Sequence, residues 1–282
     1  MTTWVLLRGL MREARHWGEF PLQFQNGVDA RNVVTLDFPG NGSLHAQTSP
    51  STVAEMANHC RTQLKQLGYE PPYRLLALSL GAMMAVEWSR QHSTEVESMV
   101  LINTSLARYN PFYHRLRPSN YPALFRFLIS GSVAQREKLI LRLTSTQERS
   151  VLQRAQLLQR WVSYARECPV TRSNILHQLR AAVFYRDAPA KPDVPVLLLA
   201  GREDRLVNMK CSLALAQKWN CSIKIHPTAG HDLPLDDGFW VTQKVAEWLD
   251  SAIQEAEDDL ASHAKATQDK KIRPQTNPAA RP

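Results

Sequence analysis

The sequence predicts an α/β protein with a mostly parallel, twisted sheet that carries helices on both faces. Two observations predict this class. Short apolar runs of strand length, such as residues 75–78 and 196–200, alternate along the chain with longer segments of helical character. These runs also lack the polar alternation of a half-exposed strand, as is typical of strands buried on both faces. The chain has 282 residues, 44% of them hydrophobic, which is enough for one large domain.

Six strands are expected, each ending at a turn or at the start of a helix. We expect them over residues 4–7, 32–38, 73–78, 99–103, 196–200 and 222–226. Pro39 and Gly40 stop the second of these strands. Because strands that alternate with helices run parallel, their carboxyl ends share one edge of the sheet, where ligands bind. The turns after the strands are therefore the place to look for functional residues.

Helices are expected between the strands. Thr52 and Glu55 have the spacing of a capping box and begin a helix over residues 50–67. Residues 13–25, which Pro21 divides, are expected to form a short helix and a loop. The remaining helices of the core are expected over residues 81–91, 209–219 and 239–253.

The alternation of strands and helices stops between residues 106 and 190, where no convincing strand occurs. Apolar residues repeat there at helical spacing in two sets: Val151, Ala155, Leu158, Val162 and Ala165, and then Ile175, Leu179 and Val183. We therefore expect a helical insertion of residues 106–190, placed after the fourth strand. The core is expected to comprise residues 1–105 and 191–254. Residues 255–282 are polar and rich in Lys, Asp, Ala and Pro, so we expect a disordered tail.

Several classes of protein are excluded by what the sequence lacks. No apolar run approaches the length of a membrane span, and the first apolar run meets Arg8 too early for a secretory signal. The four cysteines form no C-x-x-C pair, which indicates reduced thiols in a cytoplasmic protein and no zinc site. Neither a dinucleotide fingerprint nor a phosphate-binding lysine loop is present. No cofactor and no metal are therefore expected.

The turn after the third strand carries the strongest functional signal. Ser79 lies between an apolar strand and an apolar helix, with Ala77 two residues before it and Gly81 two residues after it. Small residues at these positions let a strand fold back sharply into a helix, which exposes the serine oxygen at the edge of the sheet. The N–H of Leu80 then lies at the helix N-terminus, where developing negative charge is stabilised. A serine that merely caps a buried helix explains this motif alone about equally well.

A serine hydroxyl needs a base, and the base needs a carboxylate that orients it. Of nine histidines, His231 is the best placed, since it follows the last strand and precedes the last helix. Asp204 follows the fifth strand. Taken singly, Asp204 fits a helix cap and His231 a loop histidine equally well. All three residues together, each at the carboxyl end of a strand, favour a catalytic site. Glu203 and Asp232 are the nearest alternatives for the acid.

The sequence resembles the α/β-hydrolase superfamily over residues 4–253. The resemblance is carried by five short segments, at residues 7–10, 36–42, 78–81, 200–204 and 229–231. It implies an α/β-hydrolase fold in which Ser79 is the nucleophile, Asp204 the acid and His231 the base. It also implies that Leu10 and Leu80 supply the backbone N–H groups of an oxyanion hole, and that the helical insertion corresponds to the cap of this superfamily. Within the superfamily the chain looks most like small cytosolic serine carboxylesterases, such as the pimeloyl-[acyl-carrier-protein] methyl ester esterases.

Two positions depart from the usual pattern of the superfamily. Arg8 precedes Gly9 where a histidine is usual, and Ala77 replaces the first glycine of the serine motif. The predicted oxyanion donor near Arg8 is a backbone N–H, which an arginine side chain leaves intact. Two roles for Arg8 are open: it attracts an anionic group of the substrate, or it is a structural substitute bound to a nearby carbonyl. Ala77 makes the turn tighter without forbidding it.

Positive charge is concentrated in the insertion. Residues 106–190 contain thirteen arginines and one lysine against four acidic residues, a net charge of +10, whereas the whole chain carries +8. A solvated set of helix faces would explain this distribution, but an asymmetry of this size favours an acidic partner. An acyl carrier protein, a coenzyme A ester and an anionic lipid all fit. No nucleic-acid-binding motif is present, so nucleic acid is not expected.

The sequence therefore predicts a serine hydrolase that cleaves a small acyl ester or thioester through an acyl-enzyme. Two alternatives remain open at this stage. The same three residues serve acyltransferases, peptidases and lactonases, because the choice of acceptor depends on pocket shape and access of water. A hydrolase-like binding protein without activity is the other alternative, and the complete set of three residues argues against it.

Overall fold

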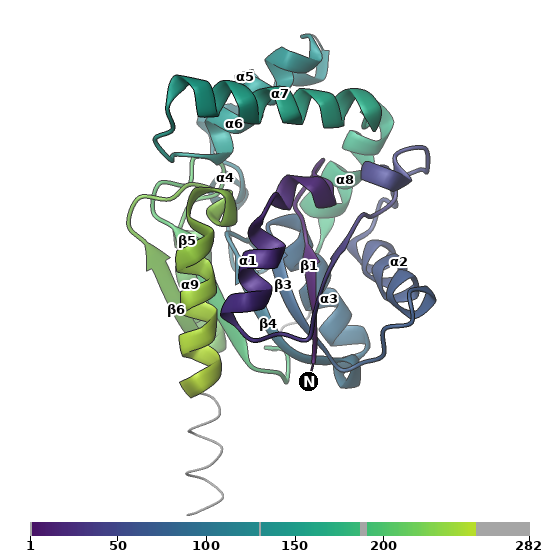
Figure 1. Ribbon diagram of the computed structural model, residues 1–282, viewed down its shortest axis with the longest axis vertical. Helices are drawn as coiled ribbons and strands as arrows, with labels where there is room; N and C mark the ends of the chain where they lie inside the picture. Colours follow the sequence, from purple (N-terminus) through teal and green to yellow (C-terminus); the bar gives the residue numbers. More distant parts are fainter. Residues whose placement is uncertain (1, 130, 187–190, 252–282) are drawn as a thin grey trace, which may run out of the picture.

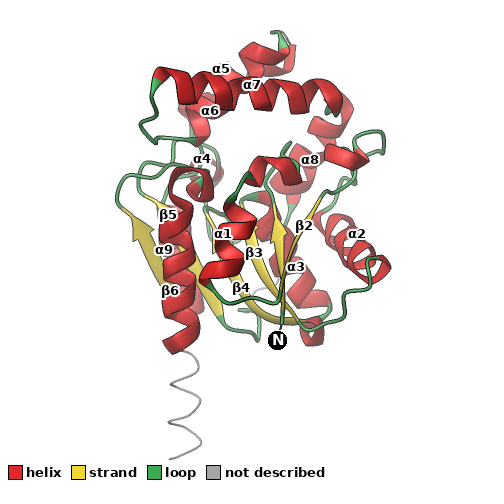
Figure 2. Cartoon of the chain, in the orientation of Figure 1, coloured by secondary structure: helices red, strands yellow, loops and turns green. Residues whose placement is uncertain are grey.

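The computed structural model describes residues 2–129, 131–186 and 191–251. Its centre is a six-stranded sheet in which every adjacent pair of strands is parallel, as predicted (Figure 2). The strand order across the sheet is β2-β1-β3-β4-β5-β6. The strands are β1 (Thr3–Leu7), β2 (Asn32–Leu36), β3 (Tyr73–Leu78), β4 (Val96–Ile102), β5 (Val196–Gly201) and β6 (Ser222–His226).

The strand predictions agree closely with these bounds, because most of the strands are continuous apolar runs buried on both faces. All residues of β1 and β5 are buried. Side chains that alternate along a strand enter two separate clusters, as the period of a strand requires. Leu7 and Leu75 point into one cluster, while Leu6 and Leu76 point into the other. The sheet is therefore covered by apolar layers on both faces.

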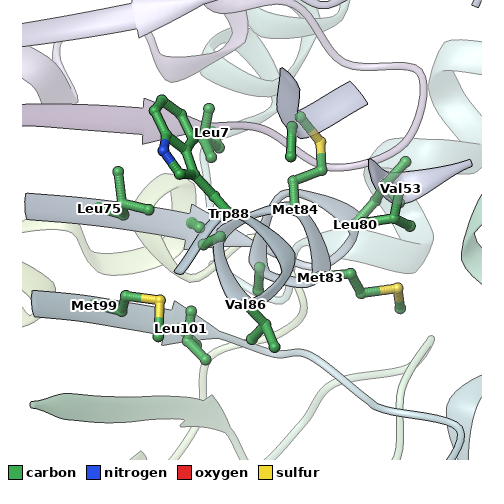
Figure 3. Close-up of a cluster of buried hydrophobic side chains, with 14 of the residues drawn as sticks. Leu7, Val53, Leu75, Leu80, Met83, Met84, Val86, Trp88, Met99 and Leu101 are labelled. Atoms are coloured by element: carbon green, nitrogen blue, oxygen red, sulfur yellow. The ribbon is translucent and has the colours of Figure 1, made fainter. Parts of the chain in front are cut away.

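Helices α2 (Val53–Gln66), α3 (Leu80–Gln91) and α9 (Lys210–Trp219) contribute to the cluster on one face, part of which Figure 3 shows around Trp88. Helix α1 (Phe20–Gly27) and a helix over residues 233–251 cover the other face. Short 3₁₀ turns precede α1 (η1, Ala14–Trp17), α2 (η2, Gly42–Leu44) and β4 (η3, Ser93–Glu95).

The prediction for the last core helix was wrong at its start. Expected from residue 239, this helix begins at Leu233, so that Pro234 lies in its first turn. Proline fits there, because the first N–H groups of a helix have no partner within the helix. The expected helix over residues 50–67 starts at Val53, where the Thr52 hydroxyl accepts a hydrogen bond from the Glu55 N–H at 3.3 Å. Pro21 lies inside the first turn of α1, and no loop follows it there.

Between β4 and β5 the described residues form only helices and turns, as predicted. They are α4 (Phe112–Arg115), η4 (Pro118–Asn120), α5 (Tyr121–Ile129), α6 (Val133–Thr144), α7 (Val151–Glu167) and α8 (Arg172–Phe184). We call residues 106–186 the insertion. Figure 1 shows α5, α6 and α7 as a layer at the top of the view, above the sheet. The predicted disordered tail, from residue 255, lies outside the described residues.

The apolar repeat predicted a helix here, and α7 confirms it, but the repeat coincides only in part with the buried face of the helix. Val151 is 89% exposed, and the buried residues of α7 are Leu157 and Trp161. These two pack with Leu141 of α6 in a small cluster of their own. The reason is that α7 rests on α6 and on polar side chains of the core, and not on the sheet. Among the described helices, none is both long enough and apolar enough to cross a membrane.

Candidate active site

The chain reverses sharply at Ser79, between the end of β3 and the start of α3. Its φ of 57° and ψ of −113° are rare for a residue with a side chain. The Ser79 N–H donates to the carbonyl oxygen of Ile102 at 2.9 Å, which ties the turn to the neighbouring strand. Leu80 is the first residue of α3, so its N–H has no acceptor within the helix. This is the geometry that the sequence predicts for a nucleophile turn.

The two small residues beside Ser79 experience different environments. A Cβ atom added at Gly81 would lie 2.4 Å from the carbonyl oxygen of Leu7 and 2.6 Å from that of Arg8. These are backbone atoms of β1 and the following turn, which cannot move aside easily. Ala77 instead lies inside β3, paired in register with Leu7 and fully buried. The departure from glycine at position 77 therefore leaves the turn intact.

His231 and Asp204 form a buried pair at the same edge of the sheet. His231 Nδ1 lies 2.7 Å from Asp204 Oδ2, and the two residues are 6% and 2% exposed. The other oxygen of Asp204 accepts the N–H groups of Leu206 and Val207 at 2.7 and 2.9 Å. Burial alone would lower the pKa of His231, but the charge and hydrogen bond of Asp204, with a smaller effect of Asp232, raise it above its usual 6.5.

Two alternatives concern Asp204: that it caps a helix, or that another carboxylate is the acid. Asp204 is not a helix cap, because α9 starts at Lys210 with Met209 at its N-cap position. Glu203 is exposed, and Asp232 binds Arg8. Of the three carboxylates, Asp204 is the one that is hydrogen-bonded to the ring of His231 and would orient it. Its role as the catalytic acid stays a prediction.

Asn103, which the sequence analysis treated only as the end of a strand, connects three loops of the site. Its φ is 46°, and its side-chain oxygen accepts the N–H of Gly201 at 2.9 Å. Its amide nitrogen donates to the carbonyl oxygens of Gly230 and His231 at 3.0 and 2.8 Å. Asn103 therefore fixes the backbone of the histidine loop against β4 and β5. The feature of the sequence that could have indicated this role is a polar residue directly after a buried strand.

The geometry decides between the two roles considered for Arg8. The side chain is 1% exposed, and its guanidinium binds Asp232 through two hydrogen bonds, Nη1–Oδ1 at 3.1 Å and Nη2–Oδ2 at 2.6 Å. The guanidinium carbon also lies 4.6 Å from the ring centroid of Trp17. Arg8 thus has a structural partner, although this partner is a carboxylate and not the expected carbonyl.

Ser79 and His231 line one cavity of about 460 Å³, together with Leu10 and Leu80, the predicted oxyanion residues. The remaining lining is mostly apolar, and much of it comes from the insertion: Phe112, Leu116, Tyr121, Leu124, Ile140, Leu143, Trp161, Leu179, Ala182 and Val183. The helical repeat predicted at Leu179 and Val183 therefore faces this cavity in part. The arrangement can hold an apolar group beside a nucleophile and a base.

Charged side chains from the turn after β1 hold the insertion over this cavity. Arg12 Nη1 lies 2.8 Å from Glu137 Oε2 of α6 and 2.7 Å from His16 Nε2. Its guanidinium carbon is 4.9 Å from the ring centroid of Trp161 in α7. Burial and the neighbouring guanidinium groups of Arg12 and Arg8 hold the pKa of His16 well below its usual range, so this histidine is neutral.

Two further polar contacts anchor the insertion. In α8, Gln178 accepts the N–H of Met11 at 2.9 Å and donates to Asn41 and Ser49, also at 2.9 Å. In the first turn of the helix over residues 233–251, Asp236 accepts the N–H of Gly230 at 2.8 Å. It also accepts hydrogen bonds from residues 145–147 of the insertion. Within the described residues no cluster of His, Cys, Asp and Glu has the arrangement of a metal site.

Comparisons with known proteins bear on the family. The model of the alpha/beta hydrolase fold family matches residues 16–238, which is more than half of the chain. The match begins after the turn that contains Arg8 and Leu10, and it includes the three predicted catalytic residues. No curated protein matches the chain by sequence.

Many solved structures share the fold. A candidate lipase from Acinetobacter baumannii AYE is 20% identical, with a TM-score of 0.71 over 90% of this chain and 85% of that one. A 2-hydroxy-6-oxo-6-phenylhexa-2,4-dienoate hydrolase from Rhodococcus sp. strain RHA1 is 18% identical, with a TM-score of 0.70 over 87% and 89% of the two chains. A thermophilic esterase from Thermogutta terrifontis is 17% identical, with a TM-score of 0.66 over 89% and 90%. At these identities the likeness concerns the fold. The fold and the match over residues 16–238 show that this chain belongs to the alpha/beta hydrolase fold family.

Proposed function

We propose that this protein is a serine hydrolase that cleaves a carboxylic ester or thioester through an acyl-enzyme. One observation carries the proposal: Ser79, in its sharp turn, lines the same cavity as His231, which is hydrogen-bonded to buried Asp204. Hydrolases and esterases among the structural neighbours are consistent with this chemistry. The orientation of His231 by Asp204 leaves its Nε2 as the atom that accepts a proton.

The reaction follows from these positions. Ser79 Oγ attacks the acyl carbon while His231 Nε2 takes the serine proton, and the carbonyl oxygen becomes an oxyanion. The N–H groups of Leu10 and Leu80 are proposed to bind this oxyanion. Collapse of the intermediate expels the alcohol or thiol, which receives the proton from His231. Water then attacks the acyl-Ser79 ester with His231 as base, and the acid is released.

The cavity favours an apolar acyl chain. Its insertion side presents mainly Leu, Ile, Val, Phe and Trp side chains. Two of the cationic residues that line it are already paired, Arg8 with Asp232 and Arg12 with Glu137. A charged group at the end of the acyl chain would therefore lose its hydration without gaining a free partner from either pair. This property supports an ester of an apolar acid over a charged peptide substrate.

The basic surface of the insertion supports an acidic carrier of the acyl group, such as an acyl carrier protein or coenzyme A. A hollow of about 430 Å³ between α5 and α6 is lined by Arg126, Arg136, Lys138 and Arg142, with no acidic residue in its lining. The earlier expectation placed this role on the insertion as a whole. The hollow makes Lys138 and Arg142, which are both exposed, the residues to test.

A cytoplasmic location remains part of the proposal. The four cysteines are free, and burial raises the pKa of the Cys60 and Cys211 thiols to about 12. Such thiols are poor nucleophiles and react slowly with oxidants.

Labelling with a fluorophosphonate, followed by a panel of acyl esters and thioesters of varied chain length, tests the enzymatic proposal. The wild type should be labelled once, at Ser79, and should cleave apolar acyl substrates, whereas Ser79→Ala should do neither. A labelled protein without turnover on any substrate of the panel would point to transfer to another acceptor. An unlabelled wild type that still binds the acyl substrates would favour the binding-protein alternative.

A further inference from the structure

We propose that Arg8 and Asp232 act as a positioning pair, which holds the loop of the predicted oxyanion donor against the loop of the predicted base. The inference rests on the proposed function, because it assigns the pair a task in that reaction. Neither residue takes part in a chemical step of the proposed reaction. Their task is to fix the distance between Leu10 and His231.

The places of the two residues in the chain suggest this task. Arg8 directly follows β1 and stands two residues before Leu10. Asp232 directly follows His231 and precedes the helix that starts at Leu233. A carboxylate at such a position usually caps its own helix. Here both oxygens of Asp232 instead accept from the guanidinium of Arg8, which is 224 residues away in sequence.

The geometry of the pair makes it a rigid connection. Two nearly parallel hydrogen bonds fix both the distance and the plane of the two groups, which a single contact would not do. The side chains of Arg8 and Asp232 are 1% and 3% exposed, so water does not compete for these bonds. The ring of Trp17 limits the guanidinium from one face. The Asp232 N–H also donates to the carbonyl oxygen of Thr144 at 2.7 Å, which adds the insertion to the same joint.

The pair also sets the charge near His231. The groups that act on this ring are Asp204, which binds it, Asp232, whose charge raises its pKa, and Arg8, whose charge lowers it. Arg149 and Asp236 lie beyond them, and the charge of Asp232 acts on Arg149 in turn. Because Asp232 and Arg8 oppose one another, an intact pair has a small net effect on His231. Loss of one member leaves the charge of the other uncompensated, and the two losses act in opposite directions.

The test measures kcat, KM and the acid limb of the pH–rate profile on a small neutral ester. Arg8→Lys keeps the charge but loses the second hydrogen bond, so kcat should fall about tenfold or more with KM nearly unchanged. Asp232→Asn should move the acid limb to lower pH, and Arg8→Gln should move it to higher pH. The double variant Arg8→Gln with Asp232→Asn should return the limb to the wild-type position while kcat stays low.

The control is Arg74→Lys, at an arginine that binds Glu97 near the opposite edge of the sheet. It makes the same charge-preserving substitution at a more exposed ion pair, and its kcat and acid limb should equal those of the wild type. Removing one member of a buried pair can unfold a protein, so only variants that unfold cooperatively and are fully folded at the assay temperature are compared. The charge-preserving Arg8→Lys and the neutral double variant are the two most able to fold.

Two results would overturn the inference. The first is a folded Arg8→Lys with wild-type kcat. The second is a set of folded single variants whose melting temperatures fall while their acid limbs stay in place, since this is what a purely structural pair predicts. Both results are distinct from failure of the proposed function, which would appear in the wild type as absent labelling or absent turnover, or as turnover that survives Ser79→Ala.

Discussion

The core and the insertion use different means to build the two sides of one cavity. On the core side, Ser79, Leu80 and Asp204 are placed by main-chain hydrogen bonds and by the buried sheet. On the insertion side, α6 and α7 share only a small apolar cluster, and buried polar side chains such as Glu137 and Gln178 attach the insertion together with the apolar side chains that α8 packs into the core. We infer that the core determines the proposed chemistry, while the insertion determines which substrate reaches it. The two kinds of function should therefore respond to different substitutions.

The largest effect is expected for the nucleophile and the base. Ser79→Ala and His231→Ala should each lower kcat by a thousandfold or more, on the order of 10³–10⁶, because such residues act as a unit. Thermal unfolding of Ser79→Ala should stay close to that of the wild type, whereas His231→Ala should lower the melting temperature while leaving the protein folded, because buried Asp204 loses its partner. Substantial turnover by either variant would place the active site elsewhere in the molecule.

The next effect concerns the predicted acid. Asp204→Asn should lower kcat by roughly 10²–10⁴, because an amide that accepts the N–H groups of Leu206 and Val207 turns its NH₂ toward His231 and selects the wrong tautomer. Some activity should remain. The matched control is Glu203→Gln at the exposed neighbouring residue, which should be fully active. Full activity of Asp204→Asn, measured under saturating substrate, would move the acid to another residue.

The pH profile follows from the raised pKa of His231. Only the neutral ring accepts a proton, so kcat/KM should fall about tenfold per pH unit below the raised pKa, and this limb should lie above pH 6.5. The pH dependence of stability has the opposite direction to that of kcat/KM. A histidine whose folded pKa is raised stabilises the fold at low pH, and this contribution disappears as pH rises through the folded value. A limb well below pH 6.5 would contradict the assignment of His231.

A smaller effect, of another kind, is expected at an anchor of the insertion. Asn174 of α8 is 4% exposed, accepts the N–H of Ser49 at 2.9 Å and donates to the carbonyl oxygen of Gln47 at 3.0 Å. Asn174→Leu leaves both groups unpaired, so the free energy of unfolding in urea should fall by about 1–3 kcal/mol. KM should rise severalfold while kcat changes little. The control Gln156→Leu, on the exposed face of α7, should alter neither. A loss confined to kcat would break the division between core and insertion.

The smallest effect concerns salt. If Lys138 and Arg142 receive an acidic carrier, kcat/KM on a carrier-bound or anionic acyl substrate should fall as ionic strength rises, because such charges are screened over about 8 Å at physiological salt. Lys138→Glu with Arg142→Glu should mimic high salt. From the sequence alone, the residues expected to receive the carrier are Arg154 and Arg160, which are exposed on α7, and charge reversal of this pair serves as the comparison. Equal salt dependence for a small neutral ester would remove the carrier from the proposal.

The sequence predicted the sheet well because local composition determines it. Continuous apolar runs such as those of β3 and β5 have no other place than a buried strand. The loops that carry Asp204 and His231 could be predicted too, since each lies a few residues after a predicted strand, β5 and β6 respectively. Their hydrogen bond, across 27 positions, required the structure.

The sequence failed where distant residues decide. The repeat in α7 predicted a helix but could not locate its buried face, because Arg12 and His16, far away in the chain, contact Trp161. The partner of Arg8 is 224 positions away and leaves no periodic signal. The start of the last helix was missed because Pro234 and Gly238 have the composition of a turn. Asn103 shows the same limit, since its role comes from three strands and loops that meet only in the folded protein.

The unequal environments of positions 77 and 81 affect how distant members of this family can be found. The position two residues before the serine tolerates alanine, since Ala77 packs within β3. At position 81, the carbonyl oxygens of Leu7 and Arg8 exclude every side chain. A search pattern that requires glycine on both sides of the serine would therefore discard sequences such as this one. A pattern that requires it only after the serine would retain this chain, and for the steric reason that its structure shows at Gly81.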